Sequence, residues 1–146
     1  KGGVFYNHAR VGKGEEVFRI CNFRSMYDDA DARRRELERQ HVFTDALSRL
    51  PEDMRVTSFG RFLRRFSLDE IPQLINVLKG EMSLVGPRPH IPSEVAQYKE
   101  WHKRKFDVLP GITGLTQVSG WKNLSLDEMV RLDIYYIENW SPWQDV

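Results

Sequence analysis

Two adjacent carboxylates, Asp69 and Glu70, are the residues of this chain whose chemistry is most suggestive. Arg64 and Arg65 shortly precede them, and Arg88 follows between two prolines in the segment GPRP. One carboxylate of such a pair can bind Mg²⁺ while the other attacks phosphorus, and arginines neutralise the charge of a phosphoryl group in transfer. These residue types are therefore consistent with a magnesium-phosphate site.

The same letters, SLDE, also occur as a helix-start pattern, at 67–70 and again at 125–128. Ser followed three residues later by Glu is the capping-box signature. It accounts for the second copy, which runs into a helical apolar pattern. In the first copy Pro72 would interrupt a helix capped by Ser67, so we expect a kink or a regular helix that begins near Pro72. We expect the cap to aim the carboxylates, although spacing alone favours a purely structural role.

The elements that must position these residues predict an α+β fold, mainly helical with a small β-hairpin or sheet, in a single compact domain. A hairpin is expected over 4–23 and a charged helix over 28–50. Phe59, Phe62, Leu63 and Phe66 recur at helical spacing and should face the core. Further expected elements are a helix after Ser67 that ends at Gly80, a β-prone run at 81–89, a basic helix at 93–106, a short strand within 108–121 and a helix at 124–140.

Bulk composition limits the function classes. The chain has 146 residues and a net charge of +1, which gives no general signal for nucleic acid. Cys21 is its single cysteine, so an internal disulfide is excluded and a reducing compartment is indicated. No apolar run approaches the roughly 20 residues of a membrane span. The opening KGGVFYNHARVGKG resembles the middle of a protein, so we expect residues 1–146 to be a fragment of a longer, membrane-associated protein.

The stretch FGRFLRRFSLDEIPQLINVLKGEMSLVGPRP closely resembles the signature of bacterial sugar transferases of the polyprenyl-phosphate glycosylphosphotransferase type, or monotopic phosphoglycosyl transferases. The likeness continues through NHARVGKGEEVFRICNFRSM, LPGITGLTQVSGW and LDIYYIENW, and so covers nearly the whole chain. It implies transfer of a hexose 1-phosphate from a UDP-sugar to undecaprenyl phosphate with release of UMP, the first step of O-antigen, capsule or exopolysaccharide assembly. It also implies the cytoplasmic face of the bacterial inner membrane and a re-entrant helix that this sequence lacks.

The resemblance also implies roles for single residues. Asp69 would attack the β-phosphate and form a covalent phosphosugar intermediate, which the lipid phosphate would then attack. Glu70 would hold Mg²⁺, the family's cofactor, and Arg88 would bind a phosphate of either substrate. Further candidates for substrate or phosphate binding are Arg24, Arg64, Arg65, Arg104 and Gln117.

These further candidates each have a structural alternative. Arg24 could equally form a salt bridge with a neighbouring acid, and one of Arg64 and Arg65 could be a surface charge or meet a lipid headgroup. The basic helix with Arg104 fits a membrane surface as well as a phosphate site. Gln117 follows a loop that could merely turn the chain. Asn22 and Leu109 stand where the family usually has basic residues, which predicts weaker phosphate binding.

The partners implied are a UDP-sugar, undecaprenyl phosphate and the membrane surface, without nucleic acid, and a homodimer is compatible with the resemblance. A competing hypothesis is a basic module that binds membrane or nucleic acid without catalysis, through the arginines of 55–65 and the helix at 94–106. A third is a non-catalytic scaffold, against which intact Asp69, Glu70 and Arg88 argue. The sequence does not separate galactose from glucose or an N-acetylated sugar.

Overall fold

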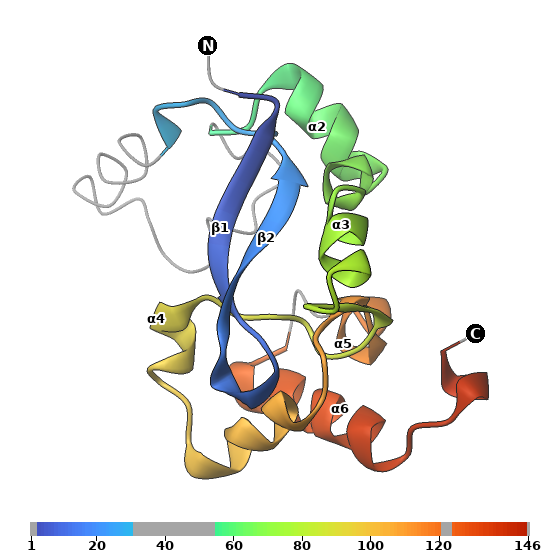
Figure 1. Ribbon diagram of the computed structural model, residues 1–146. Coiled ribbons are helices and arrows are strands. Elements are labelled where there is room, and N and C mark those ends of the chain that lie inside the picture. The colour runs from blue at the N-terminus through green and yellow to red at the C-terminus, as the bar shows by residue number, and fades with distance from the viewer. Residues whose placement is uncertain (1–2, 31–54, 121–123, 146) are drawn as a thin grey trace. The chain divides into compact units, whose positions relative to one another are not determined.

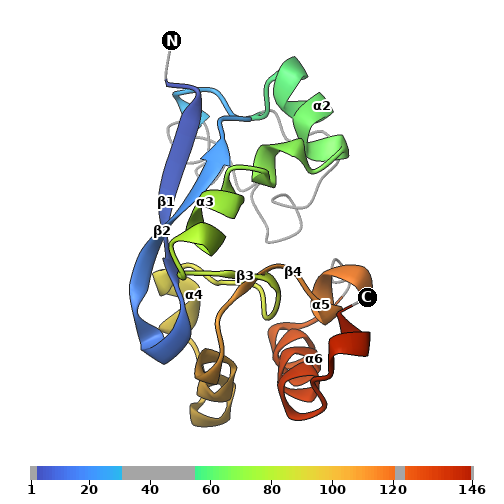
Figure 2. The ribbon, with the colours of Figure 1, turned by 45° about the vertical axis from the view of Figure 1, so that its right-hand side comes forward.

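The computed structural model describes residues 3–30, 55–120 and 124–145, and Figures 1 and 2 show it from two sides. Helices and short strands mix along the chain, and the predicted α+β fold is confirmed. By its contacts the chain separates into two compact units. The first unit comprises Lys1–Tyr6 and Asn22–Pro72, and the second comprises Asn7–Cys21 and Gln73–Val146.

The predicted hairpin is present as strands β1 (Phe5–Val11) and β2 (Val17–Phe23), which pair in a two-stranded sheet. A short 3₁₀ helix, η1 (Lys13–Glu15), makes the turn between them. Figure 1 shows the pair as a long twisted ribbon, as is usual for a sheet of only two strands.

The first unit is built around the contact between Ser25 and helix α2 (Ser58–Arg65). Thr57 caps this helix, because its hydroxyl oxygen accepts a hydrogen bond from the Gly60 amide at 2.8 Å. The Thr57 amide in turn donates to the Ser25 carbonyl at 3.0 Å. A Cβ on Gly60 would lie 1.9 Å from that carbonyl oxygen. Only glycine therefore allows the helix to approach Ser25 so closely.

The aromatic face of α2 points away from the core, so the expectation that its phenylalanines are buried is wrong. Phe59, Phe62 and Phe66 are 68%, 51% and 58% exposed, whereas Leu63 is buried. Their rings follow one another along the helix, with centroids 6.3 Å and 5.1 Å apart. The physical reason is that Gly60 and Leu63 form the packed face, which leaves the aromatic stripe outside the contact.

The second unit contains a parallel pair of strands, β3 (Ser83–Val85) and β4 (Gly111–Thr113), which Figure 2 shows side by side. Ser83 is opposite Gly111 and Val85 is opposite Thr113. The remaining elements of this unit are helices α3 (Gln73–Leu78), α4 (Pro92–Val95), α5 (Leu115–Val118) and α6 (Leu126–Glu138), with 3₁₀ helices η4 (Glu100–Asp107) and η6 (Pro142–Gln144).

Most of these elements were predicted, and one was predicted wrongly. The helix before Gly80, the strand at 81–89, the strand within 108–121 and the final helix are all present. The basic helix expected over 93–106 is instead two short pieces, α4 and η4, because Lys99 is extended, with φ −75° and ψ 161°. The helix expected over 28–50 lies almost wholly outside the described residues.

The core of the second unit combines apolar side chains with satisfied polar ones. Met82 and Val130 are among its most deeply buried residues. Asn76 is 1% exposed, accepts from the Cys21 amide at 3.0 Å and donates to the Arg19 carbonyl at 2.8 Å, which fastens α3 to β2. Among the described residues, no helix is long and apolar enough to cross a membrane.

Candidate active site

The two candidate carboxylates lie on a single turn of 3₁₀ helix, η3 (Leu68–Glu70). Asp69 and Glu70 are both partly buried. Ile71 and Pro72 follow, and regular helix resumes only at Gln73. The expectation that Pro72 delays the regular helix is confirmed, and the turn before it carries both carboxylates.

Ser67 does not cap this turn, so the expectation of a capping box at the first SLDE is wrong. Its backbone is left-handed, with φ 54° and ψ 21°, and its side chain makes no capping hydrogen bond. Its amide instead donates to the Arg64 carbonyl at 3.3 Å, as the residue after a helix C-cap commonly does. Ser67 therefore ends α2 rather than starting the next element. Its left-handed backbone sets the direction in which the turn with Asp69 and Glu70 leaves α2.

The second SLDE is a capping box, as expected. The Ser125 hydroxyl accepts from the Glu128 amide at 3.3 Å, and the Glu128 carboxylate accepts from the Ser125 amide at 2.7 Å. Asp127 ties α6 to η4, because its carboxylate pairs with Lys99 at 2.5 Å and with His102 at 3.0 Å. The Lys99 hydrogen bond holds the pKa of Asp127 below its usual value.

Arg64 is the predicted cation that the structure brings to the carboxylate turn. Its Nε lies 4.0 Å from Asp69 Oδ2 and donates to the Ser25 hydroxyl at 2.9 Å. Of these two partners of the Arg64 guanidinium, Ser25 is only 6% exposed and is held in place by the residues around it. A cation at this distance stabilises negative charge on Asp69. Ser25 lies in the segment NHARVGKGEEVFRICNFRSM of the family resemblance, but sequence reasoning assigned it no role.

Arg24 and Arg65 have other neighbours. Arg24 Nε donates to the Gly3 carbonyl at 2.8 Å, and a terminal nitrogen pairs with Asp28 at 3.2 Å. This is the salt bridge that the sequence left open as an alternative. The Arg65 guanidinium lies over the exposed Phe66 ring, 5.8 Å from its centroid. A direct role for either arginine in substrate binding stays a prediction.

In the second unit Arg88 is half-buried between the buried residues Pro87 and Pro89. Burial lowers the pKa of the neighbouring His90 to about 2, and the positive charges of Lys105, Arg88 and Arg10 lower it further. Burial likewise lowers the pKa of His8 to about 4. The histidines beside Arg88 are therefore neutral, and Lys105 and Arg10 are two further cations close to His90. Sequence reasoning missed Arg10, although NHARVG belongs to the family resemblance, and it placed Lys105 in the basic helix that fits a membrane surface as well as a phosphate site.

The Arg88 loop also depends on a close approach of two backbones. The Gly86 amide donates to the Thr113 carbonyl at 2.9 Å, and a Cβ on Gly111 would lie 2.1 Å from the Gly86 nitrogen. A Cβ on Gly114 would lie 2.2 Å from the Gly86 carbonyl oxygen. Glycines of the segment PGITG therefore support the turn that begins GPRP.

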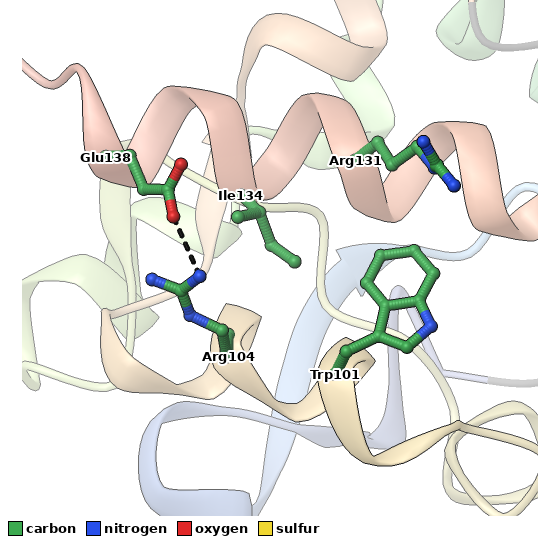
Figure 3. A pocket seen from close by; sticks show the side chains of 5 residues that line it. All are labelled: Trp101, Arg104, Arg131, Ile134 and Glu138. Atoms are coloured by element: carbon green, nitrogen blue, oxygen red, sulfur yellow. Dashed lines mark ion pairs between the residues drawn. The ribbon is translucent and has the colours of Figure 1, made fainter.

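Arg104 lines an open pocket of about 490 Å³ between η4 and α6 (Figure 3). It pairs there with Glu138 at 2.7 Å, and Arg131 lies over the Trp101 ring, 5.6 Å from its centroid. The carboxylate partner favours a structural role, and phosphate binding by Arg104 stays a prediction.

Gln117 has a side chain suited to ligand binding. Both polar atoms of its carboxamide are buried, and neither has a hydrogen-bond partner among the described residues. Buried polar groups are nearly always paired in folded proteins, so an unpaired amide on the short helix α5 suggests a ligand. The observation supports Gln117 as a candidate without testing its role.

The carboxylate pair suits the magnesium ion that the resemblance implies. Mg²⁺ is usually held by one or two carboxylates, with substrate phosphates and water completing its six oxygens. Glu70, beside Asp69 on one turn, would supply one such carboxylate. The described residues contain no group of three or more candidate metal ligands.

Comparison with known proteins identifies the family of the chain. Residues 1–146 match the family described as bacterial sugar transferase. The chain is 43% identical over 146 residues to a galactosyl transferase, CpsE, of Streptococcus agalactiae, covering 99% of this chain and 32% of the relative. It is 40% identical to the undecaprenyl-phosphate galactose phosphotransferase of Salmonella typhimurium, covering 99% of this chain and 31% of the relative.

A further relative is the UDP-glucose:undecaprenyl-phosphate glucose-1-phosphate transferase of Escherichia coli. The identity is 39%, and the match covers 99% of this chain and 31% of the relative. The chain thus spans about a third of the length of these three relatives. Because the family match extends over every residue, this chain belongs to the bacterial sugar transferase family.

Proposed function

We propose that the protein containing this chain transfers a hexose 1-phosphate from a UDP-sugar to undecaprenyl phosphate and releases UMP. The names of two relatives, a galactose phosphotransferase and a glucose-1-phosphate transferase acting on undecaprenyl phosphate, support this substrate pair. The observation that carries the proposal is the Asp69 carboxylate, partly buried on a turn beside Glu70, with Arg64 4.0 Å away. The reaction would start polysaccharide assembly at the cytoplasmic face of the inner membrane.

The proposed chemistry has two displacements at one phosphorus. An Asp69 oxygen attacks the β-phosphorus of the UDP-sugar, the bond to the bridging oxygen breaks, and UMP leaves with that electron pair. The product is a phosphosugar joined to Asp69 as a mixed anhydride. An oxygen of the lipid phosphate then attacks the same phosphorus, and Asp69 leaves as a carboxylate. Two steps let a polar substrate and a lipid substrate use one nucleophile in turn.

Four other residues have supporting roles in this proposal. Glu70 holds Mg²⁺, which when bound neutralises charge on the diphosphate. Arg64 screens the negative charge that Asp69 and the phosphate bring together, and the Ser25 hydroxyl keeps its guanidinium in place. Arg88 binds a phosphate of the nucleotide sugar or the lipid, because its guanidinium offers two parallel donors.

The aromatic face of α2 supports contact with a membrane surface. Phe59, Phe62 and Phe66 are exposed on one stripe, and Arg65 lies over the last ring. An apolar stripe bordered by a cation suits the boundary between acyl chains and anionic headgroups. The undecaprenyl phosphate substrate resides in the same boundary, so this face would hold the carboxylate turn near it.

The test uses the full-length protein in lipid nanodiscs with Mg²⁺, undecaprenyl phosphate and a panel of UDP-sugars. We expect UMP release from at least one donor and its loss in Asp69→Asn. Asp127→Asn is the matched control, because the same four letters surround it, and it should retain activity with some loss of stability. Equal UMP release by wild type and Asp69→Asn would refute the proposal.

A second measurement isolates the covalent step. Incubation with the productive UDP-sugar and Mg²⁺, without lipid acceptor, should raise the protein mass by one sugar phosphate in wild type and not in Asp69→Asn. The competing binding-module hypothesis predicts instead that vesicle binding, steeply weakened by salt, is unchanged by Asp69→Asn. The productive donor would also identify the sugar.

A further inference from the structure

The backbone that carries Arg88 is held at four consecutive carbonyl groups, those of residues 87–90. Each accepts a hydrogen bond from a different donor. In chain order the donors are the Gly111 amide at 2.9 Å, the Lys105 ammonium at 3.0 Å, the Arg10 guanidinium at 3.1 Å and the Val11 amide at 3.0 Å. All four carbonyls are therefore paired with donors from other segments, and these bonds constrain the loop backbone.

The donor to the Arg88 carbonyl itself is part of a buried polar chain. Lys105 Nζ lies 2.9 Å from Asp133 Oδ2, and the two side chains are 2% and 3% exposed. The other oxygen of Asp133 accepts from the Thr116 hydroxyl at 2.6 Å. Lys105 comes from η4, Asp133 from α6 and Thr116 from α5. Three helical elements thus converge on a single loop carbonyl.

Stability alone is a poor explanation for this ion pair. Removing both charges from water is costly, and an apolar pair of similar volume is often as stable or more so. Burial lowers the pKa of Lys105, which is the mark of that cost, and the Asp133 charge opposes the lowering. The pair does what an apolar pair cannot: it directs an N–H donor at the carbonyl of Arg88.

We infer that the buried pair of Lys105 and Asp133 is a positioning device that fixes the Arg88 backbone and so sets where its guanidinium meets a phosphate. The inference rests on the proposed function, because it takes Arg88 to be a phosphate ligand. Lys105 touches no substrate in this scheme. It acts through Arg88, and Thr116 acts through Asp133.

The decisive variant replaces both charges together, Lys105→Met with Asp133→Leu, in the full-length protein. This swap leaves no unpaired buried charge, and Thr116 keeps the Met129 carbonyl at 3.3 Å as an acceptor. We expect an unfolding midpoint at or above that of wild type, with kcat/KM for the UDP-sugar lowered about 10-fold to 100-fold. Lys79→Met, a surface lysine of the same unit, should leave both unchanged.

Coupling to Arg88 distinguishes positioning from a general effect. In an Arg88→Ala background the charge swap should change kcat/KM by less than about twofold, because the residue it positions is gone. A stable swap variant with the kcat/KM of wild type would overturn the inference. So would a swap that lowers kcat/KM equally with and without Arg88.

Hydrogen–deuterium exchange of residues 86–91 gives a readout that needs no activity. Exchange there should be about 10-fold faster in the swap variant, while residues 58–65 of the other unit keep the rate of wild type. Should wild type release no UMP, the proposed function fails while this measurement still decides whether the pair holds the loop. Unchanged exchange would overturn the inference.

A milder variant serves if the swap does not fold. Thr116→Val removes the hydroxyl that orients Asp133 and keeps the side-chain shape. It should raise exchange of residues 86–91 and lower kcat/KM about 3-fold to 10-fold, less than the swap does, because the pair of Lys105 and Asp133 remains. No change in either quantity would count against the inference.

Discussion

Arg64 Nε lies 4.0 Å from Asp69 Oδ2, so the last turn of α2 places a cation beside the carboxylate turn that follows it. The Ser25 hydroxyl fixes the same nitrogen at 2.9 Å. We expect Arg64→Met, which keeps the apolar stem and removes the charge, to lower kcat about 10-fold to 100-fold in the UMP-release assay. Ser25→Ala should lower it less, because the charge remains.

Arg61→Met is the control for this prediction. Arg61 lies one turn earlier on the same helix, and its exposed guanidinium donates to the Ser58 hydroxyl at 3.3 Å. It should leave kcat within about twofold, as is usual for a surface substitution. Equal losses in the two methionine variants would mean that general charge, rather than proximity to Asp69, sets the rate.

Gly60→Ala should be strongly destabilising. The added Cβ would lie 1.9 Å from the Ser25 carbonyl oxygen, and backbone cannot yield as a side chain would. We expect a loss of about 2–4 kcal/mol in the free energy of unfolding, measured by urea titration, since overpacking costs 1–3 kcal/mol or more. Ser58→Ala, on the exposed side of the same helix, should stay within about 0.5 kcal/mol. Similar midpoints for both variants would contradict the close approach.

The two copies of SLDE should respond differently to the same change. Ser125→Ala removes a hydroxyl that caps α6 and should cost about 1 kcal/mol of unfolding free energy. Ser67→Ala removes no cap and should cost less. Ser67→Gly should instead stabilise by about 1 kcal/mol, because glycine adopts the left-handed conformation without strain. If Ser67→Ala and Ser125→Ala were equally destabilising, Ser67 would be a cap after all.

Stability should fall on mild acidification because of His90. The pKa of His90 is about 2 in the folded chain and 6.5 in the unfolded chain. Below pH 6.5 the imidazole is therefore protonated in the unfolded chain and stays neutral in the folded chain. The contribution is fully present above pH 6.5 and is lost progressively as the pH falls towards the folded pKa. We expect a falling thermal midpoint between pH 6.5 and about pH 4.5, where most carboxylates still stay ionised.

His90→Asn should flatten that pH dependence while keeping an acceptor for the Tyr98 hydroxyl. His8, whose pKa is lowered to about 4, contributes a smaller dependence of the same sign. Replacing both histidines should remove most of the slope. A double variant with the slope of wild type would show that other groups are responsible.

The exposed aromatic stripe of α2 should govern binding to anionic vesicles. Phe59→Ser and Phe62→Ser should each weaken binding about 10-fold in a sedimentation assay, because burying a phenylalanine is worth 1.5–3 kcal/mol. Trp143→Ser is the control, since Trp143 is 87% exposed outside this stripe. If the tryptophan variant were the weaker binder, the stripe would not be the membrane face.

The sequence predicted the α+β class, the hairpin, the delayed start of α3 and the capped α6, because each follows from local patterns of turn, proline and cap. It failed where tertiary contact overrides pattern. Helical spacing cannot tell which face of α2 packs against the rest of the unit. The contact of Gly60 with Ser25 determines that face. The letters SLDE cannot reveal that Ser67 closes the preceding helix.

The candidate site shows the same division. Asp69 and Glu70 are adjacent in sequence, so their backbones share one turn. The proximity of Arg64 to Asp69 depends on the left-handed backbone of Ser67 between them. The residue type of Ser67 does not predict that conformation. Lys105 reaches the Arg88 carbonyl from 17 residues away through a fold that sequence periodicity does not describe.

The Arg88 loop should be sensitive to substitutions at glycines that are distant from it in the sequence. Gly111 and Gly114 are distant in sequence from Gly86, yet a methyl group on either would strike its backbone. In a saturation mutational scan, the PGITG segment should therefore share the loss-of-function profile of GPRP, although its glycines carry no chemistry. A substitution in one of these two segments would require a compensating substitution in the other. The PGITG and GPRP segments should therefore covary among homologues.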